Sequence, residues 1–268
     1  MGVMLADLLV AVVAFAASAV GAVCGIGGGI LIKPVLDAVG GLDVATVNFL
    51  SGSTVLAMTA YSVIRAARSG SQAIDLAVDT PLAVGAAAGG LLGKQLFSAA
   101  AGCFENPEAA GAVQAAVLCV VTVGALVYTL VKDRVATRRV TSVGACALIG
   151  LGLGTCSSFL GIGGGPINLV VLFYFFSMDI KRAAASSLYI ILFSQAANCA
   201  ASLLTQDLSH VSLAILALMV ACGIAGGAVG RRVNARIDGA AVDRLFIALM
   251  AVIICINVVN FCKFAALA

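Results

Sequence analysis

The sequence predicts an all-α polytopic membrane protein made of two inverted repeats, and three observations lead to this fold class. Of the 268 residues, 62% are apolar and only 10% are charged, whereas soluble domains are about 45–50% apolar and about 25% charged. The charge-free runs are long enough to cross about 30 Å of hydrocarbon as helices, and they do not alternate as barrel strands do. The third observation is an internal repeat. This composition argues against a soluble enzyme or a nucleic-acid-binding protein, and a net charge of +3 is too small to indicate a polyanionic partner.

The crossing segments follow one another with short connections. Uninterrupted apolar runs occupy residues 8–32, 44–64, 109–131, 140–178, 183–206, 208–230 and 245–262, and a further crossing at about 76–97 carries Asp79 near its start and Lys94 near its end. The longest polar connections leave no room for a soluble domain. No basic region precedes the first apolar run, so we expect no cleaved signal peptide.

Glycine segments interrupt two of these runs. The run at 140–178 would be about 58 Å long as one helix, twice what a crossing needs. It contains Gly-Ile-Gly-Gly-Gly-Pro at 161–166, and the first run contains Gly-Ile-Gly-Gly-Gly at 25–29, followed by Pro34. Helix interiors tolerate such segments poorly. Each run is therefore predicted to be two helical pieces joined by an unwound segment.

The two glycine segments belong to an internal repeat. A shift of 136 residues places Gly25–Gly29 on Gly161–Gly165, and a shift of 137 places Gly89–Lys94 on Gly226–Arg231. The chain thus divides into repeats at 1–134 and 135–268 within one membrane domain. Duplication of this kind is typical of secondary transporters.

The basic residues indicate how the repeats are oriented. If each broken run crosses once, the fifteen Lys and Arg divide about evenly between the two sides. If each broken run turns back, twelve of them share one face: Arg65, Arg68, Lys132, Arg134, Arg138, Arg139, Lys181, Arg182, Arg231, Arg232, Arg236 and Arg244. The positive-inside rule favours the second arrangement. It makes each repeat a glycine-broken returning helix pair plus three transmembrane helices, with both termini non-cytoplasmic in a bacterial inner membrane. Whether the pairs span fully or are re-entrant stays open.

The duplicated motifs resemble those of a known family. Gly-Ile-Gly-Gly-Gly in each half, and Gly-Gly-x-x-Gly-[Lys/Arg] at 89–94 and 226–231, are similar to the pattern of the TauE/SafE sulfite-exporter family of permeases. The resemblance covers essentially the whole chain. It implies transport of sulfite, of organosulfonates such as sulfoacetate, or of related small anions, usually outward. Lys33 stands where the family more often has an apolar residue, which leaves the exact anion open.

The glycine segments are the first candidates for an anion site. An unwound stretch leaves amide N–H groups unpaired in the membrane, and the helix that restarts after it points its positive dipole end into the same space. An anion would satisfy both, as at other helix N-termini. The residues concerned are Gly27, Gly28, Gly29, Gly163, Gly164 and Gly165. Close helix packing or a tight turn is the alternative interpretation.

Polar side chains near these segments complete the candidate set. Lys33 lies one turn into the restarted helix, where it could neutralise an anion or extend to the outer interface. Hydroxyl and amide groups that could donate to sulfonate oxygens are Asn48, Ser51, Ser53, Thr54, Asn168, Ser186, Ser187, Tyr189 and Gln195. Hydrogen bonding between helices would explain the same residues.

Together these features predict a secondary permease that carries a small anion by alternating access. An enzyme should show a nucleophile–base pair or a metal cluster at membrane depth; with one histidine and no paired acids there, we expect no enzymatic activity, cofactor or metal. An anion channel, or a permease for another small solute, stays an alternative, and a non-transport membrane subunit is a weaker one. The expected partners are the anion and the lipid bilayer, without nucleic acid. Gly85-x-x-x-Gly89 and Gly223-x-x-x-Gly227 suit close helix crossing or a homodimer.

Overall fold

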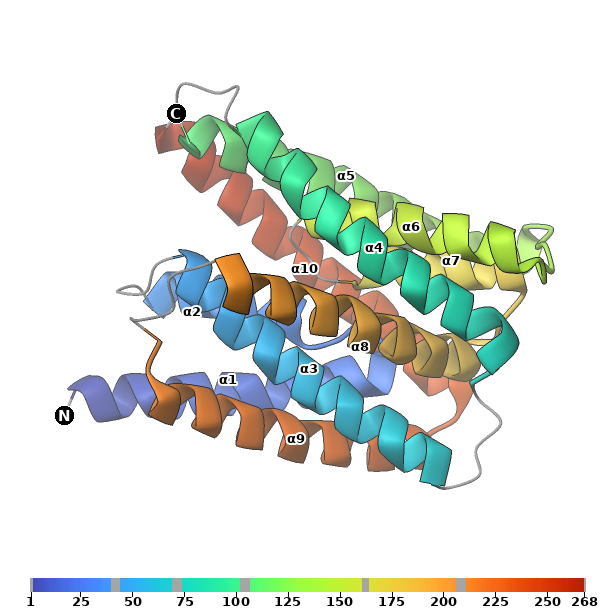
Figure 1. Cartoon of the computed structure of the whole chain (residues 1–268), viewed down its shortest axis with the longest axis horizontal. Coiled ribbons are helices and arrows are strands. Elements are labelled where there is room, and N and C mark those ends of the chain that lie inside the picture. Colours follow the sequence, from blue (N-terminus) through green and yellow to red (C-terminus); the bar gives the residue numbers. More distant parts are fainter. Residues whose placement is uncertain are drawn as a thin grey trace.

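The computed structural model describes residues 2–39, 44–68, 74–101, 107–160, 164–205 and 211–267, and the regular elements in these ranges are all helical. The first half of the chain contains five helices: α1 (Gly2–Cys24), α2 (Gly29–Val39), α3 (Val44–Arg68), α4 (Leu76–Ala101) and α5 (Pro107–Val131). A short 3-10 helix, η1 (Lys132–Arg134), precedes the second half, which contains α6 (Val143–Phe159), α7 (Pro166–Phe176), α8 (Ile180–Thr205), α9 (Leu213–Arg236) and α10 (Gly239–Leu267). Figure 1 shows them as one bundle.

The long helices confirm the predicted class of polytopic membrane protein. Six described helices are long and apolar enough to cross a membrane; they are α3, α4, α5, α8, α9 and α10. The apolar parts of α1, α6 and α7 are shorter. Each half therefore contributes three long helices that follow a broken pair, as the sequence predicts.

Both helix breaks fall at the glycine motifs. The first break separates Cys24 from Gly29, and within it Gly25 and Gly27 have φ angles of 76° and 69°. Residues with a side chain rarely adopt such angles, so glycine is needed for the turn. The chain turns back between α1 and α2 (Figure 1). At the second break, Gly164 and Gly165 also have positive φ, and Gly163 lies outside the described residues.

The helices that restart after the breaks are too short to cross alone. α2 and α7 have 11 residues each, which corresponds to about 17 Å, roughly half of the hydrocarbon thickness.

Helices of each half pack against helices of the other half. α4 packs against α6 and α8, α9 packs against α1 and α3, and α5 packs against α10. Matched glycines allow the closest approaches. A Cβ on Gly89 would lie 2.0 Å from the carbonyl oxygen of Leu151 in α6, and one on Gly226 would lie 2.2 Å from that of Phe15 in α1. These pairs correspond under the repeat shift, so matched positions make matched contacts.

The prediction of close helix crossing is confirmed for Gly85 and Gly89, which both face backbone of α6. Gly223 and Gly227 instead approach Thr54 and Met58 of α3. The inverted relation of the halves within a membrane stays a prediction.

The helix ends that carry basic residues lie together at one end of the bundle. The ends of α3 and α9, the helix η1 and the starts of α8 and α10 lie at this end, whereas the start of α1 and the end of α10 lie at the opposite one (Figure 1). All twelve basic residues that the returning arrangement places on one face are in or beside these elements. We call it the basic end.

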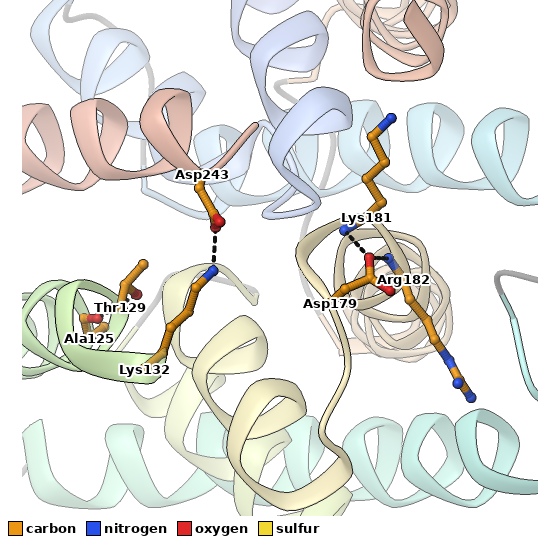
Figure 2. Close-up of polar contacts among 7 residues, drawn as sticks. All are labelled: Ala125, Thr129, Lys132, Asp179, Lys181, Arg182 and Asp243. Atoms are coloured by element: carbon orange, nitrogen blue, oxygen red, sulfur yellow. Dashed lines mark hydrogen bonds and ion pairs between the residues drawn. The ribbon is translucent and has the colours of Figure 1, made fainter. Parts of the chain in front are cut away.

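Two polar contacts organise the basic end (Figure 2). Lys132 Nζ lies 2.6 Å from Asp243 Oδ1 and joins η1 to α10. Asp179 caps α8, because its Oδ1 accepts from the backbone N–H groups of Lys181 (3.0 Å) and Arg182 (3.2 Å).

Candidate functional site

The two glycine breaks lie next to each other around Ile191, near the middle of α8. A Cβ on Gly27 would be 3.5 Å from Ile191 Cδ1 and 3.4 Å from Val55 Cγ1. A Cβ on Gly164 would be 2.6 Å from Ile191 Cγ1. Val55 is the counterpart of Ile191 under the repeat shift. Two breaks that are far apart in sequence therefore share one contact region in the centre of the bundle.

The second break borders a small polar cavity. This cavity of about 10 Å³ is lined by Ser157, Asn168 and Ser194, together with Gly164 and apolar residues. Ser157 and Asn168 are 3% and 2% exposed. Among the described residues, Ser157 Oγ has no hydrogen-bond partner. A buried hydroxyl without a partner is costly, so this cavity has unused capacity to bind a polar group.

The polar region continues beside Gly90 of α4. A Cβ there would lie 3.3 Å from Ser158 Oγ, 3.4 Å from Ser194 Oγ and 3.7 Å from Asn198 Nδ2. Ser158 Oγ and Asn198 Oδ1 are also buried and lack a partner within the part of the chain that the structure describes. We refer to Ser157, Ser158, Asn168, Ser194 and Asn198 as the polar cluster.

The chemistry of the polar cluster suits an oxyanion. Its members are serine and asparagine, which donate hydrogen bonds without carrying a negative charge. A cation lies one helical turn along α8 from Asn198, where Lys94 Nζ donates to Ser202 Oγ at 3.3 Å. Hydrogen-bond donors from α6, α7 and α8 thus lie close together, and a lysine of α4 lies at the edge of this group.

The polar cluster belongs to the second break only. Under the repeat shift, its members correspond to Gly21, Ala22, Ile32, Met58 and Ser62, of which only Ser62 carries a polar side chain. The first break therefore lacks most of the counterparts of the polar cluster, although Ser51 Oγ lies near Gly29 there, and the two breaks are chemically different.

Several predicted site residues do lie at the breaks. Gly164, Gly165 and Asn168 are buried at the second one. At the first, Gly28 lies against the backbone of Ala17, and a Cβ on Gly29 would be 3.5 Å from Ser51 Oγ.

Four other predicted residues lie on α2, α3 and α8. Lys33 is half-buried on α2, and Ser187 is fully buried with Oγ lacking a partner among the described groups. Ser53 Oγ lies 3.9 Å from Cys199 Sγ, and Gln195 is buried beside Gly52.

The remaining predicted residues make contacts elsewhere. Thr54 Oγ1 donates to the Leu50 carbonyl of its own helix at 2.7 Å. The Tyr189 hydroxyl lies 3.3 Å from Thr80 Oγ1, so it joins α8 to α4. Asn48 is exposed on α3.

The last predicted residue, Ser186, contacts a carboxylate that the sequence does not mark as buried. Ser186 Oγ donates to Asp79 Oδ2 at 3.0 Å, and the Asp75 backbone N–H donates to the same oxygen at 2.8 Å. Asp79 lies in the first turn of α4, as expected from the sequence, but it is completely buried.

Sequence reasoning also missed Ser157, Ser158, Ser194 and Lys94 as parts of a site. The available signal was the Ser-Ser pair at 157–158, two residues before the second glycine motif.

Comparison of the sequence with protein families gives a match over most of its length. The family model described as Sulfite exporter TauE/SafE matches residues 10–256. No curated protein and no solved structure matches the chain. The match covers nearly the whole chain, including both glycine motifs and both helix breaks. The chain therefore belongs to the sulfite exporter TauE/SafE family, whose members are membrane transporters of sulfur-containing anions.

Proposed function

We propose that this protein is a secondary permease that carries sulfite, or an organosulfonate such as sulfoacetate, out of the cell. One observation carries the location of the anion site: both glycine breaks lie against Ile191, and the second borders the polar cluster. Family membership supports the class of cargo.

The polar cluster offers the donors that a sulfur oxyanion needs. Sulfite and sulfonates present three oxygens that accept hydrogen bonds. The hydroxyls of Ser157 and Ser194 and the amide of Asn168 line one cavity. The same cavity lies at the start of α7, where Gly165 precedes Pro166 at the first helical position. The positive end of the α7 dipole adds to the attraction for an anion.

Anion binding at this site requires helix movement. A cavity of about 10 Å³ has room for about one water molecule, which is less than a trioxo sulfur anion needs. The helices around it come from both halves, since Ala86 of α4 faces Gly154 of α6 and Ile190 of α8. We therefore propose that one group of helices rocks against the other to open the site alternately to each side.

The proposed orientation places the basic end in the cytoplasm and both termini outside it. A tag at the N-terminus should then react with a membrane-impermeant reagent added to intact cells from the periplasmic side. Labelling that requires access from the cytoplasm would contradict this topology.

Transport in proteoliposomes tests the proposed function. We expect saturable uptake of radiolabelled sulfite or sulfoacetate, and counterflow driven by unlabelled anion. Removing a donor to a charged ligand costs about 1.5–3 kcal/mol, so Ser157→Ala and Asn168→Ala should each lower kcat/KM about tenfold or more. Ser142→Ala is the matched control, because this exposed serine at the start of α6 makes no cap hydrogen bond with its side chain.

Other outcomes separate the alternatives. Unsaturable flux without counterflow would indicate an anion channel, and no flux of any sulfur oxyanion would reject the proposed cargo. Lys33→Met tests whether this lysine takes part, since it should abolish transport if the ammonium group binds the anion. Unchanged flux with normal expression would exclude that role.

A further inference from the structure

A second polar cavity lies at the basic end of the bundle. This cleft of about 70 Å³ lies between α1, α3, α8 and α9, and its polar lining consists of Ser62, Lys181, Arg231 and Asn234. None of its described lining residues is acidic. It is several times larger than the cavity at the second break. We refer to it as the basic cleft.

Hydrogen bonds hold two of the polar side chains in place. Arg231 Nη1 donates to the carbonyl oxygen of Ser62 at 2.9 Å, which fixes the guanidinium against α3. Asn234 Nδ2 donates to the carbonyl oxygen of Val23 at 2.6 Å. Val23 lies in the last turn of α1, directly before the first glycine break. The wall of the basic cleft is therefore attached to the start of that break.

Lys181 supplies a second cation. It leaves the start of α8 in a different direction from the neighbouring Arg182 (Figure 2). Arg182 Nη2 lies 3.6 Å from Asp75 Oδ2, while Lys181 lines the basic cleft. None of the ion pairs formed among the described residues involves Lys181. Of these two adjacent cations, one is thus paired with a carboxylate and the other faces the cleft.

One face of α8 leads from the basic cleft to the middle of the bundle. Lys181, Ala184, Leu188 and Ile191 follow at helical spacing, so they share this face, and ten residues of helix span about 15 Å. The first break runs along it, since a Cβ on Gly25 would lie 2.2 Å from Ala184 Cα and Gly27 lies against Ile191. This face of α8 therefore has the basic cleft at one end and the region where the two breaks meet at the other.

We infer that the basic cleft is a second anion-binding position, at which a sulfur oxyanion binds at the basic end before it reaches the glycine breaks. This inference rests on the proposed function. A guanidinium and an ammonium group, with no acid among the described residues that line the cleft, form a site for a small oxyanion. Their positive field raises the local anion concentration at the side from which export would start.

Sided transport kinetics test this inference. Anion exchange is measured without ion gradients in proteoliposomes of known orientation, with radiolabelled sulfite and, in parallel, sulfoacetate. We expect Arg231→Gln and Lys181→Gln each to lower kcat/KM about tenfold, the loss that corresponds to one charge-assisted contact. Reversibility requires the same fall in both directions. For anion added at the basic end, the loss in kcat/KM should appear as a higher KM. For anion added at the opposite end, it should appear as a lower kcat.

Two further variants separate binding from structure. Arg232→Gln removes the same charge from the next residue, which is exposed and does not line the cleft, and should change KM less than twofold. Arg231→Lys keeps the charge but weakens the contact with Ser62, and should keep KM at the basic end within about threefold of the original value. The melting temperature of each variant reports on folding.

The inference is overturned if Arg231→Gln behaves as Arg232→Gln does, if KM rises equally at both ends, or if Arg231→Lys is as damaging as Arg231→Gln. The proposed function fails in a different way, because the unaltered protein would then show no saturable flux of sulfite or sulfoacetate. The proposed site at the second break fails if Ser157→Ala and Asn168→Ala leave transport unchanged, whatever the variants of the basic cleft do.

Discussion

Substitution of Gly154 by alanine tests one of the closest helix contacts among the described residues. Gly154 lies where α6 crosses α4, and a Cβ there would be 2.1 Å from the carbonyl oxygen of Ala86 and 2.8 Å from its Cα. All these neighbours are backbone atoms of α4. No side-chain rotation can therefore relieve the clash, and the two helices must separate.

The size of the effect follows from the geometry. The distance from the added methyl group to the Ala86 oxygen would be about 1.3 Å shorter than an ordinary 3.4 Å contact. Overpacking costs about 1–3 kcal/mol, and a clash with backbone belongs at the upper end of that range. The higher helix propensity of alanine offsets about 1 kcal/mol. A net loss of about 2 kcal/mol should lower the melting temperature by about 4–8 °C.

Gly152→Ala is the matched control for this measurement. Gly152 lies one half-turn away on the same helix, and a Cβ there meets no atom of another described element within 4 Å. Both variants are purified in one detergent, and unfolding is followed by the reaction of a thiol dye with buried cysteines. Gly152→Ala should melt at or slightly above the original temperature. If Gly154→Ala has the same melting temperature as Gly152→Ala, α4 and α6 do not pack as closely as the structure shows, and the reasoning is refuted.

Three further predictions concern other contacts. Asp79→Ala should destabilise the protein by about 1–3 kcal/mol in thermal unfolding, because it leaves buried donors, including Ser186 Oγ, without an acceptor. Asp79→Asn keeps an acceptor and should lose less stability. Equal stability of the two variants would contradict this role of the carboxylate. A double-mutant cycle of Lys132→Met and Asp243→Asn should give a coupling energy of about 0.2–1 kcal/mol at low salt, since the pair is 19% and 27% exposed, and a zero coupling would show that the contact contributes nothing. Gly25→Ala should prevent accumulation of folded protein, judged by size-exclusion chromatography, because it combines a φ of +76° with a Cβ 2.2 Å from backbone of α8; a monodisperse, active variant would show that this turn tolerates a side chain.

The elements of the fold were largely predictable from the sequence. The helix breaks fall at Gly25–Gly29 and Gly161–Gly165 because a cluster of glycines carries a high cost inside a helix, and this cost is local. The crossing helices follow from runs without charge, since each charge at membrane depth is expensive. The twelve basic residues gather at one end because they lie at helix ends whose order along the chain is already set.

The site was predictable only in part. Gly164 and Asn168 were expected because they belong to a motif or directly follow it. Ser157 and Ser158 were not, because their helix α6 is apolar on nearly every side. A helix of that kind has no periodic pattern to show which face meets which neighbour. Asp79 illustrates the same point: its depth follows from its place in α4, but its burial depends on the packing of α8.

By itself, the sequence determined that this chain is a helical membrane protein with two glycine-broken segments, and its duplicated motifs indicated the family. These properties follow from composition and from local backbone energetics. Only the tertiary structure decided that both breaks meet at Ile191, that Ser157, Asn168 and Ser194 line a cavity at the second break, and that Lys181 and Arg231 share a cleft. Each of these contacts joins residues from different elements, and the contact of Gly27 with Ile191 also joins the two halves. They depend on how the helices pack, which neither hydropathy nor spacing along the chain specifies.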